Sequence, residues 1–152
     1  MIRKGTLSDI RELQELFVGS VLAICKPDYN SEQLSVWSSD IKNNERWHNI
    51  LTNQLVLVAQ KDGKITGFST LDGNHIDLFY VHKDHQREGI GLKLYEEIEK
   101  AARKQGQSEL TSDVSVTAKP FFEKVGFGVI KKQKVTIDSV ELTNFKMTKL
   151  ME

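Results

Sequence analysis

Two glycines stand where a helix is expected to begin. Gly89 and Gly91 lie in Q-R-E-G-I-G (86–91), between an apolar stretch at 75–81 and an amphipathic helical pattern. Glycine disfavours a helix by about 1 kcal/mol relative to alanine. It also leaves open the unpaired amides and the positive dipole end of the first helical turn, which attract phosphate. The spacing predicts a backbone cradle for a pyrophosphate, with a simple tight turn as the alternative.

Two common phosphate-binding motifs fit this segment poorly. A Walker loop carries Lys-Ser or Lys-Thr after its last glycine, whereas Leu92 and Lys93 follow Gly91. A dinucleotide-binding fingerprint needs a further glycine three residues on, inside a parallel strand–helix–strand unit, and Leu94 stands there instead. The ligand is therefore expected to be a phosphate compound of another kind.

The elements that must position this turn follow from the spacing of apolar residues. Helices are expected where apolar residues recur at helical spacing, at 8–24, at 31–51 as one or two helices, after Gly91, and at 118–125. Strands are expected at 2–4, 55–60, 65–71, 75–81, 109–116, 128–137 and 140–150. Asp-Gly turns join the three strands between 55 and 81 into an antiparallel meander. The order predicts an α+β fold with a mixed, mostly antiparallel sheet and one strand–helix–strand crossover.

Composition limits the class of protein. A chain of 152 residues without linkers or repeats suits a single domain, 1–152. Lys plus Arg equals Asp plus Glu at 21 each, so no overall field favours nucleic acid. Apolar runs fall well short of the roughly 18 residues of a membrane span, and the N-terminus has no apolar leader core. The single Cys25 excludes an internal disulfide and, with these features, favours a cytoplasmic protein. No metal site is expected.

The segment around the two glycines resembles the acyl-CoA-binding motif of the GNAT N-acetyltransferase superfamily. Gln86-x-x-Gly89-x-Gly91 follows LFYVHKDH and precedes an amphipathic helix, as in that motif. The segment SVTAKPFFEKVGF (115–127) is similar to the family's second signature, and the element order matches over nearly the whole chain. The resemblance implies a six- or seven-stranded sheet, splayed at its central parallel strands and flanked by helices. It also implies direct transfer of acetyl from acetyl-CoA to a primary amine of a small molecule, peptide or protein.

For the cofactor, the resemblance implies mostly backbone contacts. The amides of 86–91 would hold the pyrophosphate of coenzyme A, and the strand at 79–81 would pair with its pantetheine amides. Ser115 and Ala118 would line the far side of the thioester, and Arg87 could meet a phosphate. The residues expected at acetyl-CoA are Phe79, Tyr80, Val81, Gln86, Arg87, Glu88, Gly89, Ile90, Gly91, Ser115, Ala118 and Phe122.

The transfer needs a group that takes a proton from the amine, because an alkylammonium with a pKa near 10 cannot attack. Strict strand alternation would place His75, Asp77, Phe79 and Val81 on one face. Some relatives carry a catalytic glutamate at the position of His75. His75 and Asp77 are therefore candidate bases, and the amide near Val81 is the candidate donor to the carbonyl oxygen.

The proton donor to the leaving thiolate is the main departure from the family pattern. The position of the usual tyrosine is Phe122, which has no proton to give. Tyr80, Tyr29, Tyr95 or water could serve instead, or the thiolate could leave unassisted; Tyr80 is taken as the candidate. The same departure motivates a second hypothesis, an acyl-CoA-binding or regulatory module with weak or no catalysis.

The acceptor site is expected where the family varies, at residues 25–37. Tyr29 and Trp37 would form an aromatic wall, although packing is an equal alternative for the tryptophan. Asp113, in the middle of a strand, is a third candidate for acceptor contact. The long C-terminal strand at 140–150 would offer an edge at which two subunits could pair as a homodimer. No motif identifies the acceptor.

Overall fold

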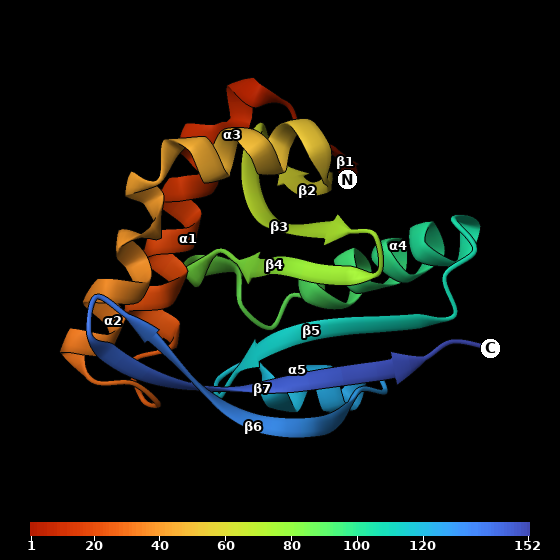
Figure 1. The fold of residues 1–152 in the computed structure, drawn as a ribbon. Helices are drawn as coiled ribbons and strands as arrows, with labels where there is room; N and C mark the ends of the chain where they lie inside the picture. Colours follow the sequence, from red (N-terminus) through yellow and green to blue (C-terminus); the bar gives the residue numbers. More distant parts are fainter.

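A seven-stranded mixed sheet runs through the computed structural model, which covers residues 1–152 (Figure 1). The strands are β1 (Ile2–Lys4), β2 (Leu55–Lys61), β3 (Lys64–Asp72), β4 (His75–Val81), β5 (Glu109–Ser115), β6 (Gly128–Ile137) and β7 (Val140–Leu150). Their order is β1-β2-β3-β4-β5-β7-β6, and only β4 and β5 pair in parallel. The predicted α+β class and the single crossover are confirmed.

Five helices cover the two faces of this sheet. They are α1 (Ile10–Ile24), α2 (Ser31–Ser38), α3 (Asn44–Asn53), α4 (Ile90–Lys104) and α5 (Lys119–Lys124). Short 3₁₀ turns precede α1 (η1, Leu7–Asp9), join α2 to α3 (η2, Ser39–Lys42) and follow β4 (η3, Lys83–His85). The asparagines before α2 and α3 cap them, because the Asn30 and Asn43 side chains accept amides of the first turn. The predicted helical segment 31–51 is therefore two helices.

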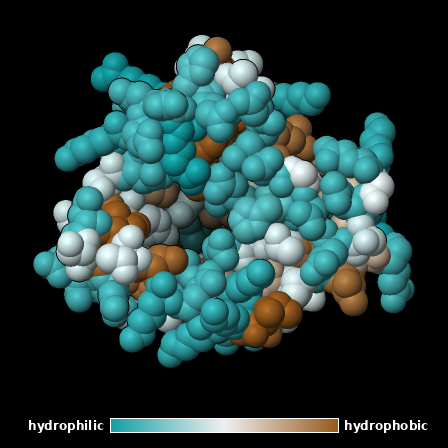
Figure 2. Space-filling view, viewed as in Figure 1, coloured by the Kyte–Doolittle hydropathy of each residue, from teal (hydrophilic) through white to brown (hydrophobic).

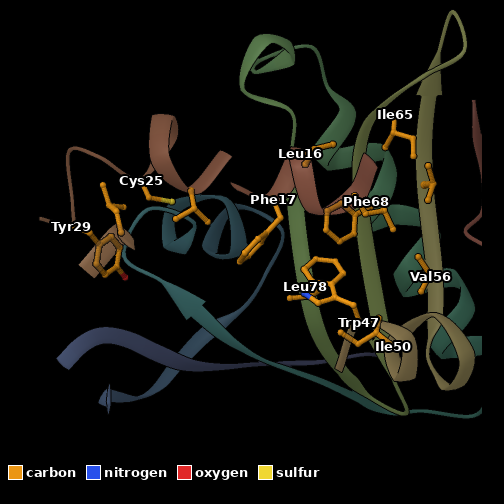
Figure 3. Close-up of a cluster of buried hydrophobic side chains, with 14 of the residues drawn as sticks. Leu16, Phe17, Cys25, Tyr29, Trp47, Ile50, Val56, Ile65, Phe68 and Leu78 are labelled. Atoms are coloured by element: carbon orange, nitrogen blue, oxygen red, sulfur yellow. The ribbon is translucent and has the colours of Figure 1, made fainter. Parts of the chain in front are cut away.

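The core is divided by the sheet into two clusters. On the α1 face, Phe17, Trp47 and Phe68 are almost fully buried and pack together (Figure 3). On the α4 face, Leu94 and Ile98 of α4 are fully buried in the second cluster, as their helical spacing predicts. Each face of the sheet is thus joined to the helices that cover it by its own apolar cluster.

Strand β4 contains a bulge that the alternation pattern did not predict. Between its pairings with Ser69 and Leu71 of β3, β4 carries one extra residue. The amide of Leu78 donates to Oγ1 of the buried Thr70 at 3.0 Å, instead of to a backbone carbonyl. Ile76 packs on the α4 face, whereas Leu78, two residues on, packs on the α1 face. The bulge therefore reverses the direction of side chains within the strand.

The expectation that His75, Asp77, Phe79 and Val81 share one face is consequently wrong. Phe79 packs on the α4 face, whereas Asp77 reaches Arg46 of α3, on the opposite face. An inserted residue shifts the period of two by one position, and nothing in the local sequence marks where this happens.

Strands β4 and β5 separate soon after they begin to pair. Their parallel ladder covers only His75 and Ile76 of β4, although both strands continue for several residues. The amide of His82 donates to the carbonyl of Thr66 on β3, so alternation of the peptide groups aims the amides of Phe79 and Val81 toward the gap. The predicted splay is therefore present, with an unpaired strand edge along it.

The C-terminal strand is not an edge strand. β7 pairs with β5 on one side and with β6 on the other, so the expectation that 140–150 offers a free edge for a second subunit is wrong. The edges of the sheet are β1 and β6. β6 carries Lys131, Lys132 and Lys134, and charged residues of this kind protect exposed edges from pairing.

Candidate active site

A cavity of about 1220 Å³ opens where β4 and β5 separate. Figure 2 shows it as a hollow near the middle of the face seen in Figure 1, with apolar surface along its left and lower side. Typical ligand sites measure roughly 300–1,000 Å³, so this cavity has room for an extended cofactor and a second molecule. The predicted site residues that line it are Tyr29, Trp37, Asp77, Phe79, Tyr80, Val81, Gln86, Arg87, Gly89, Ile90, Gly91, Asp113, Ser115, Ala118 and Phe122.

The glycine turn lies directly before α4, where the sequence predicts a backbone cradle. Gly89 precedes α4 in a left-handed conformation with a φ of +80°, which strains any residue that carries a side chain. The first helical bond runs from the amide of Lys93 to the carbonyl of Gly89, so the amides of 90–92 have no partner within the helix. A Cβ on Gly91 would lie 3.4 Å from the ring of Phe121, so a larger side chain there would collide with it. The amides of 90–92 therefore lack helical partners, and no protein atom lies within 4 Å of the Cβ position of Gly89.

The remaining residues of the turn stabilise its shape. The Gln86 side chain donates to the carbonyls of Val81 and His82, at 2.9 and 3.2 Å, and so ties the turn to the end of β4. Arg87 has a φ of +61°, which is uncommon for a residue with a side chain. The carboxylate of Glu88 lies 3.1 Å from Nδ1 of His85, and Glu88 does not line the cavity. The side chains of Gln86 and Glu88 are thus structural, and only their amides remain candidates for ligand contact.

These features fit coenzyme A. The amides at the start of α4 suit a diphosphate, and the unpaired edge at Phe79 and Val81 suits the amides of a pantetheine arm. Ser115 accepts the amide of Ala118 through its hydroxyl at 3.0 Å, which begins α5 on the opposite wall. Phe122 is buried against Phe79, with ring centroids 5.7 Å apart, and closes this wall with carbon atoms alone.

Two of the tyrosines cannot readily serve the leaving thiolate. The Tyr95 hydroxyl donates to Glu99 at 2.7 Å, outside the cavity. The Tyr29 hydroxyl donates to the carbonyl of Thr143 at 2.5 Å and accepts the amide of Val116 at 2.9 Å, so its proton is committed. It joins the loop before α2 to β7 and to the end of β5.

Tyr80 remains as a tyrosine that lines the cavity, and the nearby Trp37 side chain can donate to its hydroxyl but cannot accept its proton. Its ring packs edge-on against Phe17, with centroids 4.9 Å apart, and also contacts Phe68. Burial raises the pKa of Tyr80, with smaller contributions from nearby acidic groups, so the hydroxyl stays protonated. It can donate a hydrogen bond at any pH at which the protein works.

His75 lies outside the cavity, contrary to the expectation that it could serve as the base. Its Nδ1 lies 2.8 Å from Oγ1 of Thr111, and its Nε2 lies 3.8 Å from Oδ2 of Asp113. The reason is its position at the start of β4, where β4 and β5 are still paired and leave no gap.

Asp77 lines the cavity at the bulge, within a network that the sequence did not reveal. Arg46 approaches both of its oxygens, at 3.2 and 3.4 Å, and Nε2 of Gln54 donates to Oδ2 at 2.8 Å. Arg46 also donates from Nε to Asp40 at 3.2 Å. Burial lowers the pKa of Arg46, but the carboxylates of Asp77 and Asp40 outweigh this effect and raise it, so the guanidinium stays charged.

The far end of the cavity combines apolar and polar walls. Tyr29 and Trp37 meet edge to face, with centroids 5.2 Å apart, and Ile137 and Leu142 of the last hairpin complete the apolar side. Asp113 lines the cavity and accepts Nε2 of Gln133 at 2.7 Å. The lining residues that sequence reasoning missed include Phe121, which belongs to the second signature, and Asp40, Arg46 and Asn144, which belong to neither signature.

The fold and this site define an acyltransferase that uses an acyl-CoA donor. A family model for the acetyltransferase (GNAT) domain matches residues 25–149. The chain is 32% identical over 146 residues to the uncharacterized N-acetyltransferase YafP of Escherichia coli (strain K12), covering 96% of this chain and 93% of that protein.

Solved structures agree with this assignment. A GCN5-related N-acetyltransferase from Rhodopseudomonas palustris is 33% identical, with a TM-score of 0.96 over 99% of this chain and 95% of that one. The PaiA N-acetyltransferase from Thermoplasma acidophilum, in complex with coenzyme A, is 25% identical, with a TM-score of 0.82 over 99% and 98% of the two chains. This chain belongs to the GNAT acetyltransferase family, and its acyl donor is acetyl-CoA.

Two kinds of feature are absent from the structure. No helix is long and apolar enough to cross a membrane. No group of three His, Cys, Asp or Glu side chains is arranged to hold a metal ion.

Proposed function

We propose that this enzyme transfers acetyl from acetyl-CoA directly to a primary amine of a small molecule. The observation that carries the proposal is one continuous cavity that is lined by the glycine turn, by the Asp77 carboxylate and by the aromatic pair of Tyr29 and Trp37. A carboxylate attracts an ammonium group, and the ring of Trp37 suits an apolar body attached to it. An amine on a peptide or protein is the alternative acceptor.

The chain's own groups would hold and orient both reactants. When bound, acetyl-CoA supplies a thioester carbonyl as the electrophile. The amides of 90–92 would hold its diphosphate, and the edge of β4 would align the pantetheine arm so that the carbonyl lies near the amide of Val81. That amide, pointing into the gap, would donate to the carbonyl oxygen as negative charge develops on it.

Asp77 and Tyr80 would manage the protons. A carboxylate is a much weaker base than an alkylamine, so Asp77 would orient the ammonium and direct its proton to water. Tyr80 would donate a hydrogen bond to the leaving thiolate. Because its pKa is raised above the ordinary value for tyrosine, near 10, and a thiol titrates near 8.5, Tyr80 would keep its proton while it does so.

A covalent route through Cys25 is disfavoured. The thiol lines the cavity, but burial raises its pKa to about 11, so little nucleophilic thiolate exists near neutral pH. Direct transfer predicts that the Cys25→Ala variant keeps its activity and that both substrates must be bound together before thiol is released.

The test is release of free thiol from acetyl-CoA with a panel of amines that differ in size and in the apolar body, and with a lysine-containing peptide. Turnover should be highest for a small amine with an apolar body. An Asp77→Asn variant should lose turnover while keeping its affinity for acetyl-CoA.

The competing reading, an acyl-CoA-binding module, predicts tight binding of acetyl-CoA without turnover of any amine. This reading is suggested by Phe122, which cannot donate a proton to the leaving thiolate, so Phe122→Tyr is the informative variant. If this variant gained an activity that the natural chain lacks, direct transfer by the natural chain would be refuted.

A further inference from the structure

We propose that Arg46 is a positioning residue for the transfer, because it fixes the carboxylate of Asp77 in the orientation that receives the acceptor amine. The inference rests on the proposed function, since it assigns a role within the acceptor half of the same cavity. It concerns a residue of α3, an element that neither of the two family signatures includes.

The contacts of Arg46 are those of a fork held at three points. One terminal nitrogen lies 3.2 Å from Oδ1 of Asp77, and the other lies 3.4 Å from Oδ2. Nε donates to Oδ2 of Asp40 at 3.2 Å. Only a planar guanidinium with several fixed donors can hold two carboxylates in this way. Arg46 therefore restricts the rotation of the Asp77 carboxylate at the wall of the cavity that both residues line.

Arg46 itself is held in place by the first turn of α3. Its amide donates to the side chain of Asn43, which caps α3, and the next residue, Trp47, is fully buried and donates from Nε1 to the carbonyl of Asp40. The side chain of Arg46 is 36% exposed and that of Asp77 is 19% exposed. The pair therefore lies at the boundary between the core and the cavity, where an ion pair is stronger than on the open surface.

The bulge in β4 explains why Asp77 needs such a partner. The extra residue of the bulge leaves Asp77 on the α3 side of the strand, and Gln54 contacts only one of its oxygens. Without Arg46, Asp40 and Asp77 would face a shared space as two uncompensated carboxylates and would repel each other. Asp77 would then turn away from the acceptor, and a displacement of about 1 Å can cost about a hundredfold in rate.

No other cation forms an ion pair with Asp77, so Arg46 is the cation of this network. Tyr80 of β4 and Cys25 at the end of α1 are uncharged near neutral pH, because burial raises the pKa of both. Lys42 at the exposed rim and Asp113 on β5 also line the cavity, but no ion pair joins either of them to Asp77.

A double-mutant cycle with chemical rescue tests the proposal. Arg46→Ala should lower kcat/KM for the amine about 10- to 100-fold while the KM for acetyl-CoA stays unchanged. Asp77→Asn should have a similar effect, and the double variant should be no worse than Asp77→Asn alone, because both changes remove the same function. Ethylguanidinium, at concentrations that do not unfold the protein, should restore activity to Arg46→Ala but not to the double variant.

The matched control is Arg11→Ala, since Arg11 pairs with Glu15 on the exposed surface of α1 and should be neither impaired nor rescued. If Arg46→Ala does not fold, the same cycle is run with Arg46→Lys, which keeps the charge but loses the fork. A purely structural role for Arg46 would lower stability and give multiplicative effects in the cycle. That result, or rescue by ethylguanidinium in the Asp77→Asn background, would overturn the proposal.

A readout without turnover separates this inference from the proposed function. The terminal Nη–H protons of Arg46 donate to Asp77, so their exchange with solvent, followed by ¹⁵N NMR without substrates, should be slow in the natural chain and should become fast in Asp77→Asn. If the exchange behaves in this way but no amine is acetylated, the proposed function fails while the pairing stands. If amines are acetylated and the cycle is multiplicative, only the role of Arg46 fails.

Discussion

Replacement of Gly89 by alanine separates the cost of an unusual backbone conformation from the loss of a ligand cradle. Gly89 has a φ of +80°, and a Cβ placed on it would meet no atom within 4 Å. The penalty for alanine is therefore conformational, about 1–2 kcal/mol, less about 0.4–1 kcal/mol regained because alanine restricts the unfolded chain. We expect a net loss in the free energy of unfolding of about 1 kcal/mol.

Gly63 is the matched control for this substitution. It lies in the turn between β2 and β3, with a φ of +77° and equally open space around its Cβ position. Gly63→Ala should therefore lose about the same stability as Gly89→Ala in urea unfolding. The two variants should differ only in what the turn does for a ligand.

The difference should appear in calorimetric titration with acetyl-CoA. Relaxation of the strained turn in Gly89→Ala would rotate the amides of 90–92 away from the diphosphate. A hydrogen bond to a charged group contributes about 1.5–3 kcal/mol, so loss of one such bond should weaken binding about 10- to 100-fold. Gly63→Ala should bind as the natural chain does. Equal affinity for the two variants, with both folded, would refute the cradle.

Three further variants test the elements around the site. Thr70→Val leaves the buried amide of Leu78 without an acceptor, so it should cost about 1–3 kcal/mol in urea unfolding and lower kcat, and Thr70→Ser should restore both. Burial raises the pKa of Glu99, but hydrogen bonds led by that from Lys149 outweigh it and leave it lowered. The Lys149–Glu99 pair therefore stabilises the protein above the ordinary carboxyl pKa, and this stabilisation is lost as the pH falls. Lys149→Met should lower the free energy of unfolding by about 1–2 kcal/mol at pH 7 and by progressively less below about pH 4. A cost that does not change with pH would contradict this prediction. Tyr29→Phe removes the hydroxyl that joins β5 to β7 and should raise the KM for the amine more than that for acetyl-CoA, whereas equal changes would place its role in packing alone.

The glycine turn and the helix that follows it could be predicted because all their parts are consecutive in the chain. Gly89 and Gly91 precede α4 directly, and the buried positions Leu94 and Ile98 repeat at helical spacing. Such patterns depend on local backbone geometry, which is determined by the residue types in the same segment and not by distant segments.

The acceptor half of the cavity could not be predicted in the same way. Asp77 and Arg46 are far apart in the chain, and their contact depends on how α3 lies over β4. The residue type makes His75 a candidate base, yet the short parallel ladder between β4 and β5 places it outside the cavity. Residue type alone does not reveal on which side of a splay a side chain lies.

The sequence by itself determined the order of the elements, the position of the glycine turn directly before α4 and the absence of a tyrosine at position 122, because each depends only on neighbouring residues. Only the tertiary structure decided that β4 bulges at Leu78, that β6 rather than β7 is the edge strand, and that Arg46 holds Asp77. The physical reason is that register, strand order and ion pairing are properties of two segments in contact, so neither segment contains the information alone.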